Sequence, residues 1–259
     1  MTRRRVDTLL AERGLSGSRS SAAASVRAGR VRLGTGGPLA DKPSQLVPED
    51  AELLVEEGPR YVSRGGLKLE NALTALGVPV ADRKCLDVGA STGGFTDCLL
   101  RHGAASVIAL DVGYGQLDWG LRNDPRVHVI ERRNVRDLRP EELPYAPELT
   151  TIDVSFISLS KVLPAVSRCL APGGEVLALV KPQFELGPER AKGGVVRSPE
   201  DRREALVSAA RAASGTGLRL RGFASAGLPG PKGNRETLMW LGTDGPEIDA
   251  EQAVVEVEP

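Results

Sequence analysis

Four charged residues lie at the ends of apolar segments, where they could act together on a proton. Asp153 follows the segment LTTI, Lys181 follows EVLALV, and Glu236 precedes TLMWL. Ligands of open α/β sheets bind outside the carboxyl ends of the strands. Asp153 and Lys181 therefore share one edge of a predicted sheet, and Glu236 joins them if its strand runs antiparallel. Lys68, in SRGGLKL, lies on a helix before the first strand that could lean over the same site.

Proton transfer is the chemistry that suits this set. A lysine that follows five apolar residues is costly to bury, and burial shifts its charge state readily. The order of the four residues resembles the K-D-K-E tetrad of RNA ribose 2′-O-methyltransferases. That resemblance implies that Lys181 accepts the proton of a ribose hydroxyl, that Lys68 favours the neutral amine, and that the acids orient the two lysines. The acids also favour charged lysines, so the sequence leaves the net effect open.

A glycine-rich segment, D-V-G-A-S-T-G-G at 87–94, leaves the first strong strand and enters a helix. Glycines permit a tight turn there and let backbone amides approach a ligand. The spacing differs from the dinucleotide fingerprint G-x-G-x-x-G and resembles motif I of S-adenosylmethionine-dependent methyltransferases. An acid ends the second strand, where it can accept hydrogen bonds from the ribose hydroxyls of a nucleoside. Asn-Val follows the third strand and could present an amide and a backbone N–H to the adenine edge. The expected cofactor is S-adenosylmethionine, and its predicted binding residues are Asp87, Gly89, Ser91, Thr92, Gly93, Gly94, Asp111, Asn134, Val135 and, by resemblance, Phe156.

Alternating apolar strands and helical stretches begin at Ser63 and predict an α/β fold. Strands separated by helices imply right-handed crossovers and a parallel, doubly wound sheet of the Rossmann-like type. The last two strands are joined only by the Gly/Pro-rich GLPGPKGN and should pair antiparallel. Strands are expected at 85–90, 106–112, 126–131, 149–155, 175–180, 218–225 and 237–242, and helices at 66–76, 94–102, 116–123, 159–170 and 199–214.

The first 58 residues predict a small α+β head. Helical spacing of apolar residues stops at Gly14, and Ser16 or Ser18 can cap a second helix to about Ala28. Short strands joined by Gly/Pro turns follow. Residues 1–32 contain eight arginines and two acids, a net charge of +6. Such a head is a candidate phosphate-binding module, and a solvated basic face is the alternative.

The head also resembles a known RNA-binding fold. The patterns R-V-D-T-L-L and S-R-S-S-A-A-A-S-V-R-A-G-R-V resemble the S4 RNA-binding domain. The resemblance implies that the basic face of a helix pair binds structured RNA. The expected RNA-binding residues are Arg3, Arg4, Arg5, Arg19, Arg27, Arg30 and, beyond the head, Arg64.

Composition excludes several classes of protein. The 259 residues are 41% hydrophobic and 26% charged, with a net charge of zero, which excludes disordered and fibrous classes. Three cysteines without a C-x-x-C pair and two histidines indicate neither a disulfide framework nor a metal site. No apolar run reaches about 20 residues, and Asp7 and Glu12 break the basic start, unlike a signal peptide. We expect a cytoplasmic protein without a membrane or metal partner.

The whole chain resembles one family, TlyA, in which an S4 domain precedes an FtsJ-like methyltransferase domain. The resemblance implies 2′-O-methylation of cytidine in ribosomal RNA, in 23S RNA and in some members also in 16S RNA. With the residue patterns above, it predicts an RNA-binding domain at 1–58, a linker at 59–62, a methyltransferase domain at 63–243 and an acidic tail at 244–259. The matching segments are SRGGLKLENAL, KCLDVGASTGGFTDCLL, DVGYGQLDWGLRNDPRV, TIDVSFISL, LVKPQFELG and GNRETL.

Other functions compete with this reading. The glycine spacing and the lack of a placed His or Tyr disfavour an NAD-dependent oxidoreductase. A catalytically silent assembly factor that binds ribosomal RNA stays open. The family's haemolysin label requires an amphipathic or spanning segment, which the sequence lacks. Among the scarce aromatic residues, Phe95 and Trp119 are expected in the core.

Overall fold

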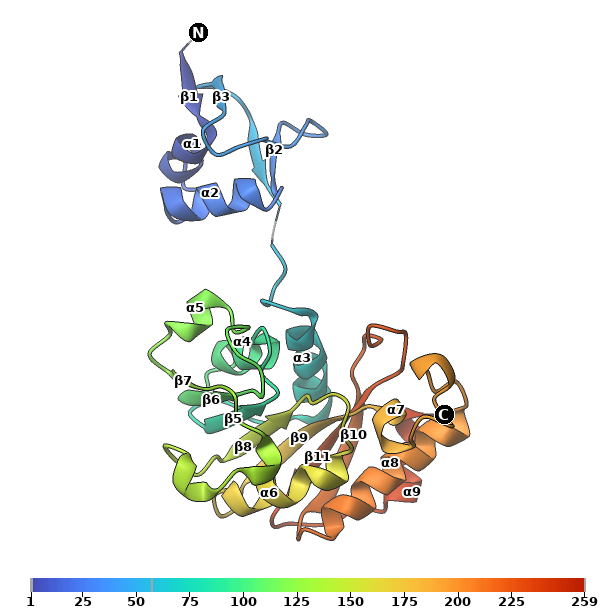
Figure 1. Cartoon of the computed structure of the whole chain (residues 1–259). Coiled ribbons are helices and arrows are strands. Elements are labelled where there is room, and N and C mark those ends of the chain that lie inside the picture. The colour runs from blue at the N-terminus through green and yellow to red at the C-terminus, as the bar shows by residue number, and fades with distance from the viewer. Residues whose placement is uncertain (1, 57, 259) are drawn as a thin grey trace. The chain divides into compact units, whose positions relative to one another are not determined.

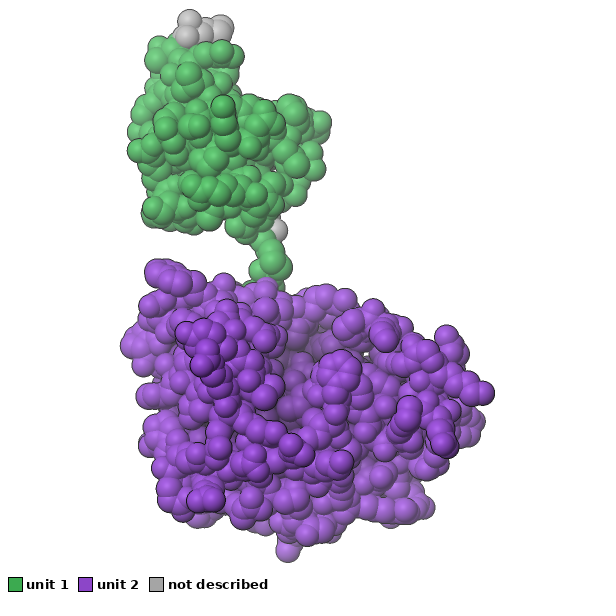
Figure 2. Space-filling view, in the orientation of Figure 1, with its two compact units in different colours: residues 1–60 green, residues 61–259 purple. Residues whose placement is uncertain are grey.

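The computed structural model describes residues 2–56 and 58–258, which form two compact units. Unit 1 is Met1–Arg60 and unit 2 is Tyr61–Pro259 (Figure 2). The second half of the expected linker belongs to unit 2. Tyr61 is buried in its core, and the Val62 backbone N–H donates to Asp97 Oδ2 at 3.0 Å. The linker prediction is therefore wrong for these two residues, because packing begins directly after Arg60.

Unit 1 is the expected small α+β head. Two helices pack against each other beside two antiparallel strand pairs, β1 with β3 and β2 with β4. Ser18 caps the second helix by accepting a hydrogen bond from the Ser21 N–H at 3.1 Å. The arginine run forms a strand that pairs with a later segment, which the sequence does not predict. The elements are β1 (Arg3–Arg5), α1 (Val6–Glu12), α2 (Arg19–Arg27), β2 (Val31–Leu33), β3 (Leu46–Pro48) and β4 (Leu53–Val55).

A seven-stranded sheet forms the centre of unit 2 (Figure 1). Its order is β10-β11-β9-β8-β5-β6-β7, and only β11 runs against its neighbours among the strands of this sheet. The mostly parallel, Rossmann-like sheet and the antiparallel final pair confirm the sequence prediction. The strands are β5 (Lys84–Val88), β6 (Ser106–Leu110), β7 (Val127–Ile130), β8 (Leu149–Ile152), β9 (Glu175–Val180), β10 (Arg219–Ser225) and β11 (Thr237–Gly242).

Helices cover both faces of this sheet and bury a separate apolar layer on each. One layer contains side chains of α3, α4 and α5, and the other contains side chains of α6, α8 and α9. Leu69 of α3 and Leu163 of α6 illustrate the two layers, since both are fully buried. The helices are α3 (Arg64–Leu76), α4 (Gly94–Arg101), α5 (Trp119–Arg122), α6 (Leu163–Cys169), α7 (Pro182–Glu185), α8 (Pro199–Ser214) and α9 (Ala250–Val257), and the 3-10 turns are η1 (Val135–Asp137), η2 (Pro140–Glu142), η3 (Leu159–Lys161) and η4 (Lys192–Gly194).

The acidic segment at 244–258 is folded onto unit 2, so its description as a tail is wrong. Asp249 caps α9 by accepting from the Gln252 N–H at 2.8 Å. Val254 is buried in the same apolar layer as α6 and α8. Glu258, directly after α9, is buried against Arg202 of α8. Buried apolar contacts and one buried ion pair therefore hold this segment against unit 2.

Candidate active site

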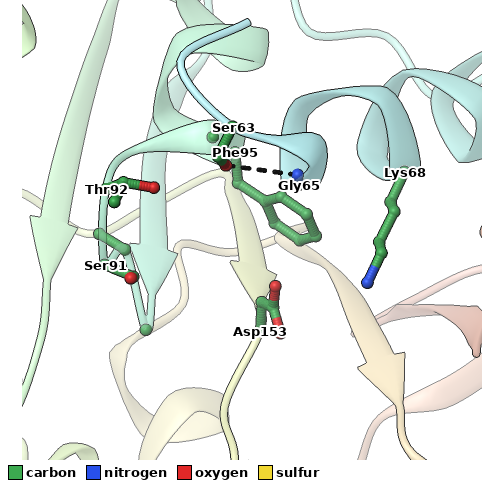
Figure 3. Close-up of a pocket in the computed structure, with 10 residues that line it drawn as sticks. Ser63, Gly65, Lys68, Ser91, Thr92, Phe95 and Asp153 are labelled. Carbon is green, nitrogen blue, oxygen red and sulfur yellow. Dashed lines mark hydrogen bonds between the residues drawn. The ribbon is translucent and has the colours of Figure 1, made fainter. Parts of the chain in front are cut away.

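A cleft in three adjoining parts follows the carboxyl ends of the strands. Asp153, directly after β8, lines all three parts. The motif part, about 130 Å³, lies between the glycine-rich loop and the start of α3 (Figure 3). The β6–β7 part, about 600 Å³, is lined by residues that follow those strands. The β9–β11 part, about 800 Å³, is lined by residues beside the end of β9 and the start of β11.

Strand register brings Glu236 to the edge where Lys181 lies. Thr237 pairs with Val180 across the antiparallel β11 and β9, so the residue before β11 lies beside the residue after β9. Glu236 accepts a hydrogen bond from Lys68 Nζ of α3 and forms an ion pair with it. The Lys68 side chain is 9% exposed and that of Glu236 only 1%. This pair is almost completely shielded from solvent.

A second ion pair joins the remaining two predicted catalytic residues. Lys181 Nζ lies 2.6 Å from Asp153 Oδ1 and donates a hydrogen bond to Ser155 Oγ at 3.0 Å. The Asp153 side chain is 26% exposed, so this pair faces the cleft. Ser155 lies two residues after Asp153 and is not among the site residues that the sequence pattern predicts. All four predicted residues line the β9–β11 part.

The glycine-rich loop contacts the end of β8 closely. Gly89 has φ of +83°, and a Cβ there would lie 2.4 Å from the carbonyl oxygen of Asp153. Gly93 has φ of +97° and caps α4, where a Cβ would clash with Leu121. Only glycine fits both positions, so the loop backbone itself forms the cleft surface. The predicted residues of this loop that line the motif part are Gly89, Ser91, Thr92 and Gly94.

Asp87 is placed behind the cleft wall rather than in it. Its carboxylate is fully buried and accepts hydrogen bonds from Thr96 Oγ1 at 2.7 Å and Thr151 Oγ1 at 3.1 Å. These bonds connect β5 to α4 and β8. Burial raises the pKa of Asp87 to about 7, against the two hydroxyl donors that lower it. The structure therefore gives Asp87 a role in holding the loop, and Gly93 likewise lies outside the residues that line the cleft.

The β6–β7 part is lined by the predicted cofactor residues that follow β6, β7 and β8. Asp111 Oδ2 accepts from the Ser91 N–H at 2.8 Å, which fixes the acid beside the glycine-rich loop. Asn134 Oδ1 caps η1 by accepting from the Arg136 N–H at 3.1 Å. These two polar side chains and the apolar side chains of Val135 and Ile157 line one space. The sequence did not single out Gln116 or Lys161, which also line it.

The aromatic residues divide between core and surface. Phe95 is 3% exposed, which confirms its expected place in the core, whereas Trp119 is 78% exposed, so that prediction is wrong. Trp119 begins the short helix α5, and only Leu121 of that helix is buried. Phe156 is 91% exposed with φ of +64°, and its ring centre lies 5.2 Å from that of Phe184. Phe156 lines both larger parts of the cleft.

The predicted RNA-binding arginines differ in how they are paired. Arg5 and Arg19 both pair with Asp7, at 2.7 and 3.3 Å, and these bonds lower the pKa of Asp7 to about 2. Arg4 pairs with Glu12 and Glu49, Arg30 donates to Ser25 Oγ, and Arg64 of unit 2 donates to the Pro229 carbonyl. Within the described residues, Arg3 and Arg27 form no ion pair.

Residues 2–56 and 58–258 contain no group of three or more His, Cys, Asp or Glu side chains placed to hold a metal ion. No helix in these ranges is both long and apolar enough to cross a lipid bilayer.

Known proteins resemble this chain over most of its length. The 16S/23S rRNA (cytidine-2′-O)-methyltransferase TlyA of Mycobacterium tuberculosis is 48% identical over 244 residues, which cover 93% of this chain and 90% of the relative. Hemolysin A of Brachyspira hyodysenteriae is 40% identical, covering 90% and 98%. A solved structure from Streptococcus thermophilus, described as a hemolysin, is 41% identical with a TM-score of 0.73, covering 99% and 96%.

A family model covers the whole cleft. The model of the FtsJ-like methyltransferases matches residues 61–243, which begin where unit 2 begins. This range contains all four residues of the two ion pairs and every residue of the glycine-rich loop. The chain therefore belongs to the FtsJ-like methyltransferase family, and S-adenosylmethionine is its methyl donor.

Proposed function

We propose that this protein methylates the 2′-hydroxyl of cytidine in ribosomal RNA, with 23S RNA as a substrate and 16S RNA as a second one. The observation that supports this most strongly is the pair of lysine–carboxylate contacts, Lys68–Glu236 and Lys181–Asp153, in one cleft. The 48% identity to a relative named for this activity supports the choice of substrate. Ribosomal substrates would also place the protein in the cytoplasm.

In this proposal Lys181 accepts the proton of the 2′-hydroxyl. A ribose hydroxyl is a poor nucleophile, so a base must lie within hydrogen-bond reach of it. Lys181 Nζ is held by Asp153 Oδ1 at 2.6 Å and by Ser155 Oγ at 3.0 Å, which fix its position at the cleft. A neutral amine at Nζ can take the proton while Asp153 stabilises the resulting ammonium.

The buried pair has a different role in this proposal. Lys68 and Glu236 neutralise each other away from solvent, so they place a fixed dipole along one side of the same space. Because both are held by secondary structure, α3 and the start of β11, the dipole is set before substrate arrives.

The β6–β7 and motif parts would hold the cofactor. Asp111 would accept the ribose hydroxyls, Asn134 and Val135 would contact the base, and the loop backbone at Gly89 would approach closely. S-adenosylmethionine supplies a methyl group on a sulfonium, and the 2′-oxygen forms the new C–O bond as the C–S bond breaks. The shared position of Asp153 between cofactor and substrate sides fits this alignment.

Unit 1 would hold the RNA. Its fold of two helices and short strand pairs, and its resemblance to S4 domains, support RNA binding. Arg3 and Arg27, without ion pairs in the described residues, are available to phosphates at no cost in broken pairs. When RNA binds, Arg4, Arg5 and Arg19 would leave their carboxylate partners and pair with phosphate groups instead.

Methyl transfer from radiolabelled S-adenosylmethionine tests the proposal. Purified protein would be assayed on 50S subunits, 30S subunits and the corresponding free RNAs, and the labelled ribose would be mapped. We expect label on a cytidine 2′-oxygen, loss of label with Lys181→Ala, and normal label with Lys84→Ala at the opposite end of the sheet. RNA binding without transfer by the wild-type protein would instead support an assembly factor and contradict the proposal.

A further inference from the structure

Two loops outside the sheet contribute to the wall of the β9–β11 part. One loop follows α7 and contributes Ala191 and Gly194, and the other precedes β11 and contributes Pro231 and Lys232. Neither loop is part of the sheet, so strand pairing does not fix their positions. In the proposed reaction this wall borders the RNA, and its position decides how the ribose reaches Lys181.

Asn234 joins these two loops directly. Its side chain donates to the Gly194 carbonyl at 2.7 Å and accepts from the Val196 N–H at 2.9 Å, and the residue is 2% exposed. Asn234 lies two residues before Glu236. The loop after α7 is thereby tied to the segment that carries the buried acid of the tetrad.

Glu258 also connects these two loops, through the side chains of Arg202 and Arg235. Its carboxylate accepts from Arg202 Nε at 2.9 Å, and Arg202 Nη1 donates to the Arg197 carbonyl, at the end of the first loop, at 2.7 Å. Arg235 Nη1, next to Glu236 in the second loop, lies 3.8 Å from the same carboxylate. The Glu258 side chain is 4% exposed, so its charge needs these partners.

We propose that Glu258 is a positioning residue for the RNA side of the cleft. Through Arg202 and Arg235, its carboxylate fixes the positions of both loops of the wall relative to Glu236. The acidic segment of the chain thus has a function in the active site, although Glu258 itself touches neither reacting atom. This inference rests on the proposed methylation of ribosomal RNA for its kinetic readout.

A second acid, on the helix that directly precedes Glu258, provides the matched control. Glu251 of α9 pairs with Arg211 of α8 at 2.9 Å, but the two side chains are 71% and 72% exposed. Glu258→Gln and Glu251→Gln therefore remove the same charge from the same helix pair. Only the first removes a contact that reaches the wall.

The experiment measures kcat/KM for RNA, the Kd for S-adenosylmethionine and amide hydrogen exchange over 190–197. For Glu258→Gln we expect an about tenfold lower kcat/KM for RNA, faster exchange in 190–197 and a cofactor Kd equal to that of the wild type. Glu251→Gln should match the wild type in all three. Normal kcat/KM and normal exchange for Glu258→Gln would overturn the inference, as would equal losses for RNA and cofactor with faster exchange throughout unit 2.

Two milder variants serve if Glu258→Gln does not fold. Glu258→Asp keeps the charge on a shorter side chain, and Arg235→Gln removes a 68% exposed partner while the Arg202 pair stays. Each should lower kcat/KM for RNA by about threefold through a slightly displaced wall, and wild-type values for both would overturn the inference. Absence of methyl transfer by the wild-type protein would instead contradict the proposed function, and the exchange data would still test the wall.

Discussion

The two ion pairs of the cleft have the same chemistry but different surroundings. Glu236 is 1% exposed beside Lys68, whereas Asp153 is 26% exposed beside Lys181. Lys181 has a second partner, Ser155, on the same loop as Asp153. A sealed pair resists a change of charge, because removing either charge leaves the other uncompensated. A pair open to the cleft can exchange a proton with a ligand, so this difference supports the proposed roles, proton transfer for Lys181 and electrostatic support for Lys68.

The largest effect should come from changing the open pair at its amine. Lys181→Arg keeps a positive charge near Asp153, but a guanidinium does not release its proton in proteins. We expect methyl transfer to fall about 10³-fold in Lys181→Arg and in Lys181→Ala, with cofactor binding retained. Single-turnover transfer with bound cofactor measures this, and Lys84→Ala is the control. Wild-type turnover by Lys181→Arg would contradict the role of Lys181 as the base and would give that role to the Lys68–Glu236 pair.

The sealed pair should respond in stability as well as in activity. Lys68→Met leaves Glu236 buried without a cation, which should lower the free energy of unfolding by about 3–5 kcal/mol. The double variant Lys68→Met, Glu236→Leu removes both charges, so it should recover most of that stability but not the activity. Chemical denaturation and methyl transfer are measured on both proteins. Recovery of activity together with stability would mean that the pair serves only the fold.

Asp153→Asn should reduce activity less than the lysine changes. The amide is uncharged and cannot stabilise the ammonium of Lys181, so we expect an about 10- to 100-fold lower rate of transfer. Stability should change little, because the side chain is partly exposed. The rate of chemistry and the melting temperature are compared with those of the wild type. A stability loss as large as that of Lys68→Met would remove the distinction between sealed and open pairs.

Asp87 extends the comparison to an acid with no cation partner among the described residues. Burial raises its pKa from 3.8 to about 7, so the native state keeps a proton that the unfolded chain releases between these values. Wild-type stability should therefore decrease as pH rises from about 4 to about 7, by a few kcal/mol, since one pKa unit corresponds to about 1.4 kcal/mol.

Asp87→Asn isolates this contribution. Its amide can replace both hydrogen bonds, with Thr96 and Thr151, without a titrating proton, so we expect this variant to lack that part of the pH dependence and to change transfer least. Denaturation at several pH values between 4 and 8 measures the difference between the two proteins. If the free energy of unfolding varied with pH in the same way in both proteins, the raised pKa of Asp87 would be contradicted.

The fold and the tetrad could be predicted because they depend on local patterns. Apolar segments of strand length placed all seven strands of the sheet to within a few residues, and Lys181 and Asp153 are simply the residues that follow two of them. Glu236 required one further step, the antiparallel direction of β11, which the short Gly/Pro connection indicated.

The parts that could not be predicted depend on contacts between distant segments. The sequence pattern predicts that Asp87 binds the cofactor. Its carboxylate instead accepts hydrogen bonds from Thr96 of α4 and Thr151 of β8, which keep it behind the cleft surface. Trp119 is exposed because α5 is too short to bury more than one side chain. Glu258 is buried because Arg202 reaches it from α8, 56 residues away, and no local pattern indicates such a pair.

The pH dependence of single-turnover methyl transfer to ribosomal RNA tests the central assignment most directly. With cofactor and RNA saturating, the wild-type rate should rise with pH and then reach a plateau, as expected for a reaction that needs an unprotonated general base. Lys181→Arg should give a rate about 10³-fold lower that lacks this rise. A pH profile of Lys181→Arg that matches the wild type in height and shape would show that another group accepts the proton.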